Sequence, residues 1–192
     1  MTTNKKYPDY LNDIKPEFKT GDLVLFEGKG LFSTLIKIKT LSKISHVGII
    51  LIENGEPVIC ESTTLSDLPD MDSGEFIKGV QKHPLKERIE KYDGKIWHAP
   101  ILVDLPNEKA MLNWLDVVHS KKVKYDWKQA FLSGFALKHI VSKENFSLLF
   151  CSELCFKALK KAGVIAKRFN ASQKNPKDIY NLAFIEEKRK LK

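Results

Sequence analysis

The sequence predicts a single domain of the α+β class, in which an antiparallel sheet packs on helices. Short β-branched and apolar runs occupy the chain as far as residue 103, and apolar residues spaced three and four apart dominate the remainder. Strands followed by helices favour this class over alternating βαβ units. At 192 residues the chain suits one domain, which we place at residues 21–184, between a lead-in at 1–20 and a basic tail at 185–192.

The clearest strand signals lie near the N-terminus. Residues 23–26 form a short apolar run bounded by glycines. In "SHVGIILIENGEPVICES", two β-branched runs flank Asn54 and Gly55, the pair that a two-residue type I′ turn prefers. This stretch therefore predicts a hairpin.

The segments around the hairpin are less regular. Residues 30–45 mix apolar and basic side chains, and their spacing suits a helix in part and a strand in part. Residues 62–94 are largely polar, so we expect a long excursion with a short helix near 85–91. A further strand is expected near 95–103.

Helical spacing dominates after residue 105. Met111, Leu115 and Val118 fall on one side of the first helical segment. Gly163 is a C-terminal signal and Pro176 an N-terminal one. Helices are expected within residues 106–120, 126–141, 151–163 and 175–184.

Composition and charge exclude several classes of protein. No apolar run approaches the ~18 residues that a membrane span needs, and the N-terminus lacks the features of a secretory signal. Three cysteines do not make a disulfide framework, so free thiols and a cytoplasmic location are expected. The net charge of +8 favours weak attraction to polyanions, but no aromatic-basic motif indicates specific nucleic-acid binding. The basic chain ends are expected to be solvated.

Two of the cysteines lie on one predicted helix, in different settings. Cys155 lies inside the apolar stripe and is expected to be a core residue. Cys151 stands where the helix begins, and there the free N–H groups favour a thiolate and can also hold an oxyanion. Cys151 is therefore either a structural cysteine or the nucleophile of an enzyme.

A nucleophilic thiol needs a base, and five histidines are available. His83, His119 and His139 fall in polar loops or helix ends, where we expect solvated surface side chains. His98 follows a tryptophan on a predicted strand and could be either a surface side chain or the base. His46 opens the first strand of the hairpin and is the candidate base.

The hairpin also supplies a candidate orienting group. With Asn54 and Gly55 as the turn, residues that face each other have numbers that sum to 109. His46 and Glu61 then lie diagonally on one face, roughly 7–8 Å apart at the backbone, whereas Cys60 points to the opposite face. A bulge would exchange the roles of Cys60 and Glu61.

A set of segments resembles a known family. "GDLVLF", "SHVGIIL", "VICES", "GVQKHPLKERIEKYDGKI", "YDWKQAF", "FCSELCFKALKKAG" and "NPKDIYNLAF" occur in this order. The series resembles the circularly permuted branch of the NlpC-type papain-like superfamily, the YiiX-like proteins, which are related to the lecithin retinol acyltransferase group. Histidine before cysteine is its most specific mark, because ordinary papain-like enzymes have the cysteine first.

The resemblance implies a permuted papain-like fold, with a small antiparallel β-barrel-like sheet packed on helices. It also implies that Cys151 is the nucleophile, His46 its base and Glu61 the third polar residue. The substrate-binding candidates are Tyr125 and Asp126, which match a family motif near the cleft, and Ser45, which precedes the histidine. No metal or organic cofactor is implied.

The expected function is that of a cysteine hydrolase that cleaves amide bonds in peptide or peptidoglycan-like substrates through an acyl-enzyme. One alternative is a lipid-directed acyltransferase or thioesterase, for which the basic and apolar segment 29–43 offers a peripheral membrane contact. A second is a non-catalytic binding module with the same fold. A zinc site built from Cys151, Cys155 and His46 is the weakest alternative, because the second cysteine pair of a typical site is missing.

Overall fold

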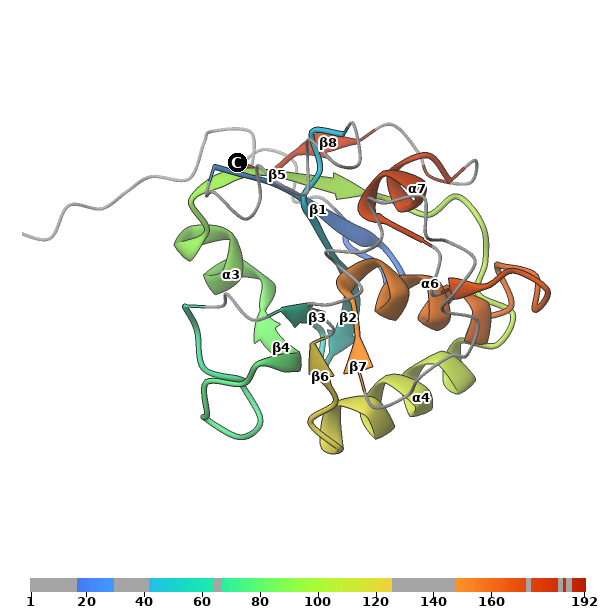
Figure 1. Cartoon of the computed structure of the whole chain (residues 1–192), viewed down its shortest axis with the longest axis horizontal. Coiled ribbons are helices and arrows are strands. Elements are labelled where there is room, and N and C mark those ends of the chain that lie inside the picture. The colour runs from blue at the N-terminus through green and yellow to red at the C-terminus, as the bar shows by residue number, and fades with distance from the viewer. Residues whose placement is uncertain are drawn as a thin grey trace, which may run out of the picture.

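The structure of the chain, a computed structural model, describes residues 17–29, 42–63, 67–125, 148–171, 174–182, 185 and 188–192. In these residues helices pack on a largely antiparallel sheet, which confirms the α+β class predicted from the sequence (Figure 1). The helix predicted at 126–141 lies outside the described residues, as does most of the irregular segment at 30–45.

In the part of the chain that the structure describes, the sheet has eight strands in the order β7-β6-β4-β3-β2-β1-β5-β8. Neighbouring strands are antiparallel, except that β6 and β7 run parallel. β7 and β8 stand at the two ends of this order, so in the described part of the chain the sheet is open rather than closed like a barrel. The strands are β1 (Leu23–Gly28), β2 (His46–Glu53), β3 (Glu56–Thr63), β4 (Gly79–Pro84), β5 (Gly94–Ala99), β6 (Lys124–Tyr125), β7 (Leu148–Leu149) and β8 (Arg189–Lys190).

The hairpin of β2 and β3 has the register predicted from its turn. Ile49 faces Cys60, and the facing pairs continue without a bulge to the turn. Asn54 and Gly55 have φ angles of 52° and 82°, the left-handed conformation that both central residues of a type I′ turn require. The turn therefore determines which side chains of β2 and β3 share a face.

Among the described residues, four helices flank the sheet: α3 (Leu85–Lys91), α4 (Glu108–Ser120), α6 (Cys151–Lys161) and α7 (Pro176–Tyr180). All four lie within segments where the sequence predicts helix. Figure 1 shows α4, α6 and α7 grouped together and α3 apart from them. Within the described residues, none of these helices combines the length and the apolar character needed to cross a membrane.

The helices bury two separate apolar clusters. The larger one joins α4, α6 and α7 to the sheet, and every side chain of α6 from Cys151 to Leu159 is buried. Truncation of a core leucine of α6, such as Leu154, to alanine would cost about 2–5 kcal/mol. The smaller cluster lies under α3 and contains Phe26, Ile59 and Ile89.

β4 contradicts the prediction that residues 62–94 form an excursion with a single helix. Residues 79–84 pair along β3 and bury Gln81, Lys82 and His83, although all three are polar. Each of these side chains has partners inside the fold; the ammonium of Lys82, for example, lies 2.8 Å from a carboxylate oxygen of Glu53 and 3.1 Å from one of Asp116. Burial of polar groups is tolerated where such partners exist.

The C-terminal residues also differ from the prediction of a solvated basic tail. β8 pairs with β5, and Leu191 is buried in the smaller cluster. The ammonium of Lys192 donates hydrogen bonds to the backbone carbonyls of Ile89, Glu90 and Tyr92 at the end of α3. Residues 188–192 are thus part of the folded domain and hold α3 in place.

Candidate active site

Cys151 is the first residue of α6. Phe150 before it has an extended backbone, with φ of −85° and ψ of 154°, so the helix begins abruptly at the cysteine. The first N–H groups of a helix have no carbonyl partner within that helix. They can therefore stabilise negative charge on the cysteine sulfur or on a nearby oxyanion. The side chain of Cys151 is buried, so a substrate reaches the thiol only when groups around it move.

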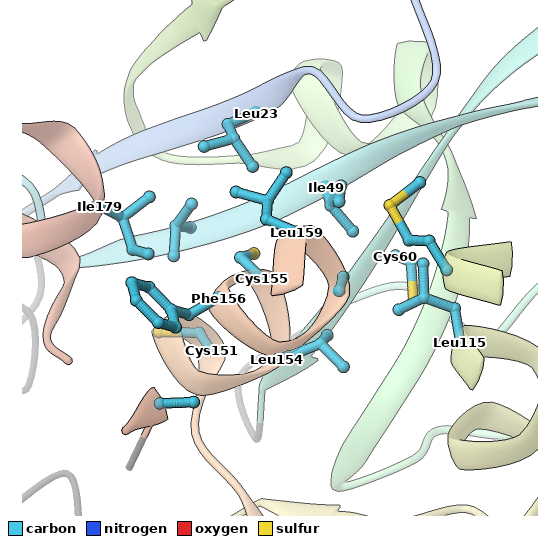
Figure 2. Packing of buried hydrophobic residues seen from close by; sticks show 14 of the residues in the cluster. Leu23, Ile49, Cys60, Leu115, Cys151, Leu154, Cys155, Phe156, Leu159 and Ile179 are labelled. Atoms are coloured by element: carbon cyan, nitrogen blue, oxygen red, sulfur yellow. The ribbon is translucent and has the colours of Figure 1, made fainter. Parts of the chain in front are cut away.

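The other two cysteines are core residues, as the sequence predicts. Burial raises the pKa of Cys60 to about 12 and raises the pKa of Cys155 well above its usual value. Both thiols therefore stay neutral near pH 7. Figure 2 shows Cys151 beside Phe156, and Cys60 near Leu115 on the other side of the helix.

His46 connects Cys151 to Glu61. Its Nε2 atom lies 2.5 Å from Oε2 of Glu61, which leaves Nδ1 for the hydrogen bond that the imidazole shares with Cys151. Burial disfavours the charged ring, but the negative charge and hydrogen bond of Cys151, together with those of Glu61, outweigh it and raise the pKa of His46 to about 9. His46 is therefore protonated at neutral pH and carries the positive charge that a catalytic thiolate needs beside it.

Arg88 of α3 holds the other side of the Glu61 carboxylate. Its Nε donates to Oε1 at 2.5 Å and its Nη2 donates to Oε2 at 3.2 Å. The guanidinium lies over the rings of Phe26 and Tyr92, 5.0 and 5.2 Å from their centroids. Burial alone would raise the pKa of Glu61, but the charges and hydrogen bonds of Arg88 and His46 hold it well below its usual range.

Arg88 was not among the residues predicted from the sequence, although a signal existed. Leu85, Arg88 and Ile89 are spaced three and four apart on α3, and all three are buried. An arginine inside an apolar stripe is unusual, because charged side chains are almost never buried unless they are paired. That pattern indicates a buried carboxylate partner.

A second layer of polar residues surrounds the carboxylate. His83 Nε2 lies 3.8 Å from Oε1 of Glu61 and 3.0 Å from the side-chain oxygen of Gln81. The Gln81 amide nitrogen donates to the backbone carbonyls of Thr63, Ile77 and Gly79, which fixes its orientation. Burial lowers the pKa of His83 and so favours its neutral form beside Arg88.

The other histidines differ in their surroundings. The prediction of solvated side chains is wrong for His83 and His119, which are buried, and the latter contacts Asp70 at 2.7 Å. His98 is buried and contacts Asp22 at 2.8 Å. His139 lies outside the described residues.

The substrate-binding candidates have different outcomes. Ser45 is buried, and its hydroxyl donates to the carbonyl of Phe26 and accepts from the N–H of Gly28; its role in substrate binding stays a prediction. Tyr125 lies in β6, but its side chain is not described, and Asp126 lies outside the described residues. The predicted membrane-contacting segment 29–43 is described only at its two ends.

The described residues do not fit a metal centre. No group of three or more His, Cys, Asp or Glu side chains among them could hold a metal ion. The arrangement fits thiol chemistry better, because a buried carboxylate, an imidazole and a cysteine follow one another in contact.

Comparison with known proteins identifies a similar fold but no activity. No protein-family model and no curated protein match the chain. Among solved structures, the fold is similar to that of the metalloprotein yiiX from Escherichia coli O157:H7, with a TM-score of 0.51 and 16% sequence identity. The match covers 88% of this chain and 94% of that protein. The chain therefore has a YiiX-like fold over most of its length.

Proposed function

We propose that this protein is a cysteine hydrolase that acts through an acyl-enzyme, with Cys151 as nucleophile, His46 as general base and acid, and Glu61 as the group that orients His46. The observation that supports the proposal is the continuous contact from thiol to imidazole to buried carboxylate. A nucleophile, a base and a third group that orients the base recur in acyl-transfer enzymes of unrelated folds.

In the acylation step, His46 holds the proton of the thiol and the Cys151 sulfur attacks the carbonyl carbon of the substrate. A C–S bond forms while the carbonyl electrons move onto oxygen, and the Cys151 N–H at the start of α6 stabilises this oxyanion. The oxyanion then collapses and the C–N bond breaks. His46 delivers its proton to the leaving nitrogen, and the amine departs.

In the deacylation step, the now neutral His46 takes a proton from water, and the resulting hydroxide attacks the thioester carbonyl. The C–S bond breaks, the carboxylic acid product leaves, and the thiolate beside a protonated His46 is restored. The Glu61 carboxylate accepts the hydrogen bond from Nε2 throughout, which keeps Nδ1 directed at the sulfur. These steps use only groups of the chain and one water molecule.

The proposed substrates are amide bonds in peptides or peptidoglycan-like material. Support comes from the motif order, with His46 before Cys151, which is the mark of the permuted NlpC-type papain-like branch. The YiiX-like fold is compatible with this assignment. Because fold alone does not determine substrate, the choice of amide bonds rests on the motif resemblance.

The test is a panel of cysteine-directed activity probes that carry either a peptide or a fatty-acyl recognition group. We expect the peptide probes to label Cys151 in the wild-type protein, and we expect Cys151→Ser to abolish labelling. Preferential labelling by fatty-acyl probes would replace the amide-hydrolase proposal with a lipid-directed acyltransferase or thioesterase. Absence of labelling by both classes would favour a binding module.

A further inference from the structure

A cavity of about 520 Å³ is lined in part by Lys43 and Ile44, which precede His46 in the chain. Its walls come from the segment before β2, from the sheet and from α7 with the residues that follow it. Lys43, Lys177 and Lys188 bring three ammonium groups to this cavity, and Trp97 and Tyr180 bring two aromatic rings. Nothing in the proposed mechanism uses these side chains.

The segment that lines one wall of the cavity leads directly into His46. Lys43 stands three residues before His46, a span of at most ~10 Å along an extended chain. Ile44 lines the cavity and belongs to the same buried cluster as Cys151 and Ile179. α7, which contributes Lys177 and Tyr180 to the cavity, packs on α6, the helix that begins at Cys151. A substrate with its carbonyl at Cys151 could therefore extend into this cavity.

The electrostatics of the cavity favour a negative group. None of the three lysines forms an ion pair with a carboxylate in the part of the chain that the structure describes, and Lys177 and Lys188 are half-buried. The Lys188 ammonium lies 4.3 Å from the centroid of the Tyr180 ring. One carboxylate, that of Glu27, also lines the cavity, but the ammonium of Lys95 lies 3.5 Å from it and offsets its charge. Three lysines therefore outnumber a single compensated carboxylate.

We propose that this cavity binds a negatively charged group of the substrate, a carboxylate or a phosphate, while Trp97 and Tyr180 contact the apolar part that carries it. The inference rests on the proposed function, since the same substrate must present its carbonyl to Cys151. It narrows the substrate class to acyl compounds that carry an anionic group.

The experiment uses bromoacetyl probes that share one electrophile and differ in charge. N-Bromoacetyl-glutamate, the cation N-bromoacetyl-lysinamide and N-bromoacetyl-phosphoethanolamine are each incubated with the full chain at low salt, and alkylation of Cys151 is followed by peptide mass spectrometry. We expect an anionic probe to react about tenfold faster than the lysine probe, and added salt to reduce this ratio. The faster of the two anionic probes identifies carboxylate or phosphate as the preferred group.

Two double variants test whether the cavity lysines cause the difference in alkylation rate between the probes. Lys43→Gln with Lys177→Gln should lower the ratio of anionic to cationic rates toward one, measured under conditions where the variant is folded. Lys160→Gln with Lys161→Gln removes the same charge at the far end of α6 and should retain the wild-type ratio. Equal loss of the ratio in both variants would show that only net charge matters and would overturn the inference.

The failure of this inference differs from the failure of the proposed function. If all probes alkylate Cys151 at equal rates in the wild-type protein, the anionic subsite is wrong while the reactive thiol stands. If no probe alkylates Cys151 while the core cysteines react, the nucleophile itself is wrong and both proposals fall.

Discussion

Replacement of Glu61 by glutamine tests the centre of the proposed site. Glu61 supplies two acceptor oxygens, and both are occupied: Oε1 accepts from Nε of Arg88, and Oε2 contacts His46 Nε2. Glutamine supplies one acceptor oxygen and one NH₂ donor. If the amide oxygen faces Arg88, the NH₂ group faces His46 and forces the wrong tautomer. If the oxygen faces His46, two donors face each other at Arg88.

The magnitude follows from burial. Arg88 is only 5% exposed, so Glu61→Gln leaves a buried guanidinium without its charged partner. Removing one member of a buried ion pair costs about 3–5 kcal/mol of folding free energy. Loss of the carboxylate that orients a catalytic histidine can slow the chemistry by up to about 10⁴-fold, as in a Ser-His-Asp triad. Glu61→Gln is therefore expected to lose both stability and Cys151 reactivity.

The assay is a double-mutant cycle with Arg88→Met, which removes the guanidinium and retains a side chain of comparable length. Urea denaturation gives the free energy of unfolding of the wild-type protein, each single variant and the double variant. Because the double variant buries no unpaired charge, it should be destabilised by less than the sum of the singles, with a coupling energy of about 3 kcal/mol. Its glutamine oxygen can again accept from His46, so Cys151 alkylation should partly recover.

Two results would refute this reasoning. Additive destabilisation, with a coupling energy below about 0.5 kcal/mol, would mean that Glu61 and Arg88 do not act as a buried pair. Unchanged alkylation of Cys151 in Glu61→Gln, measured with iodoacetamide under conditions where the variant is folded, would mean that the carboxylate does not orient the imidazole.

Three further predictions concern the thiols, the imidazole and the C-terminal strand. Iodoacetamide at pH 7 should modify Cys151 before the core cysteines, whose raised pKa values keep them protonated. Cys60→Ser should cost about 1–3 kcal/mol of stability without changing the rate of Cys151 alkylation. Comparable alkylation rates on all three thiols, measured by mass spectrometry, would contradict the assignment of Cys151 as the reactive thiol. The pKa of His46 is raised from 6.5 to about 9, so its contribution to the free energy of unfolding should be complete below pH 6.5 and lost as pH rises through about 9. The measurement is the urea midpoint of the wild-type protein across this pH range. If the midpoint of a His46→Gln variant fell equally over the same range, His46 would be excluded as the cause. Leu191→Ala should lower the free energy of unfolding in urea by about 2–5 kcal/mol, because the side chain is buried under α3. The control Lys190→Ala, at an exposed position of β8, should change it by less than about 0.5 kcal/mol. Equal effects of the two variants would show that β8 is not packed on the domain.

The contact between His46 and Glu61 could be predicted from the sequence because it depends on local chemistry. Asn54 and Gly55 adopt left-handed backbone angles more readily than other residues, and a two-residue turn allows one register. That register places Cys60 in the core and Glu61 beside His46, as the structure confirms. The start of α6 and the apolar stripe of Cys155 follow from periodicity in the same way.

Tertiary structure alone decided the features whose partners are distant in sequence. β4 carries no apolar alternation, and it is stable because Lys82 meets Glu53 and Asp116 from other elements. The pairing of Arg88 with Glu61 joins residues 27 positions apart. Burial of a charged group becomes favourable only when its partner is present, and no local pattern reveals that partner. Apolar periodicity is a property of a short segment, whereas satisfaction of a buried charge is a property of the assembled fold.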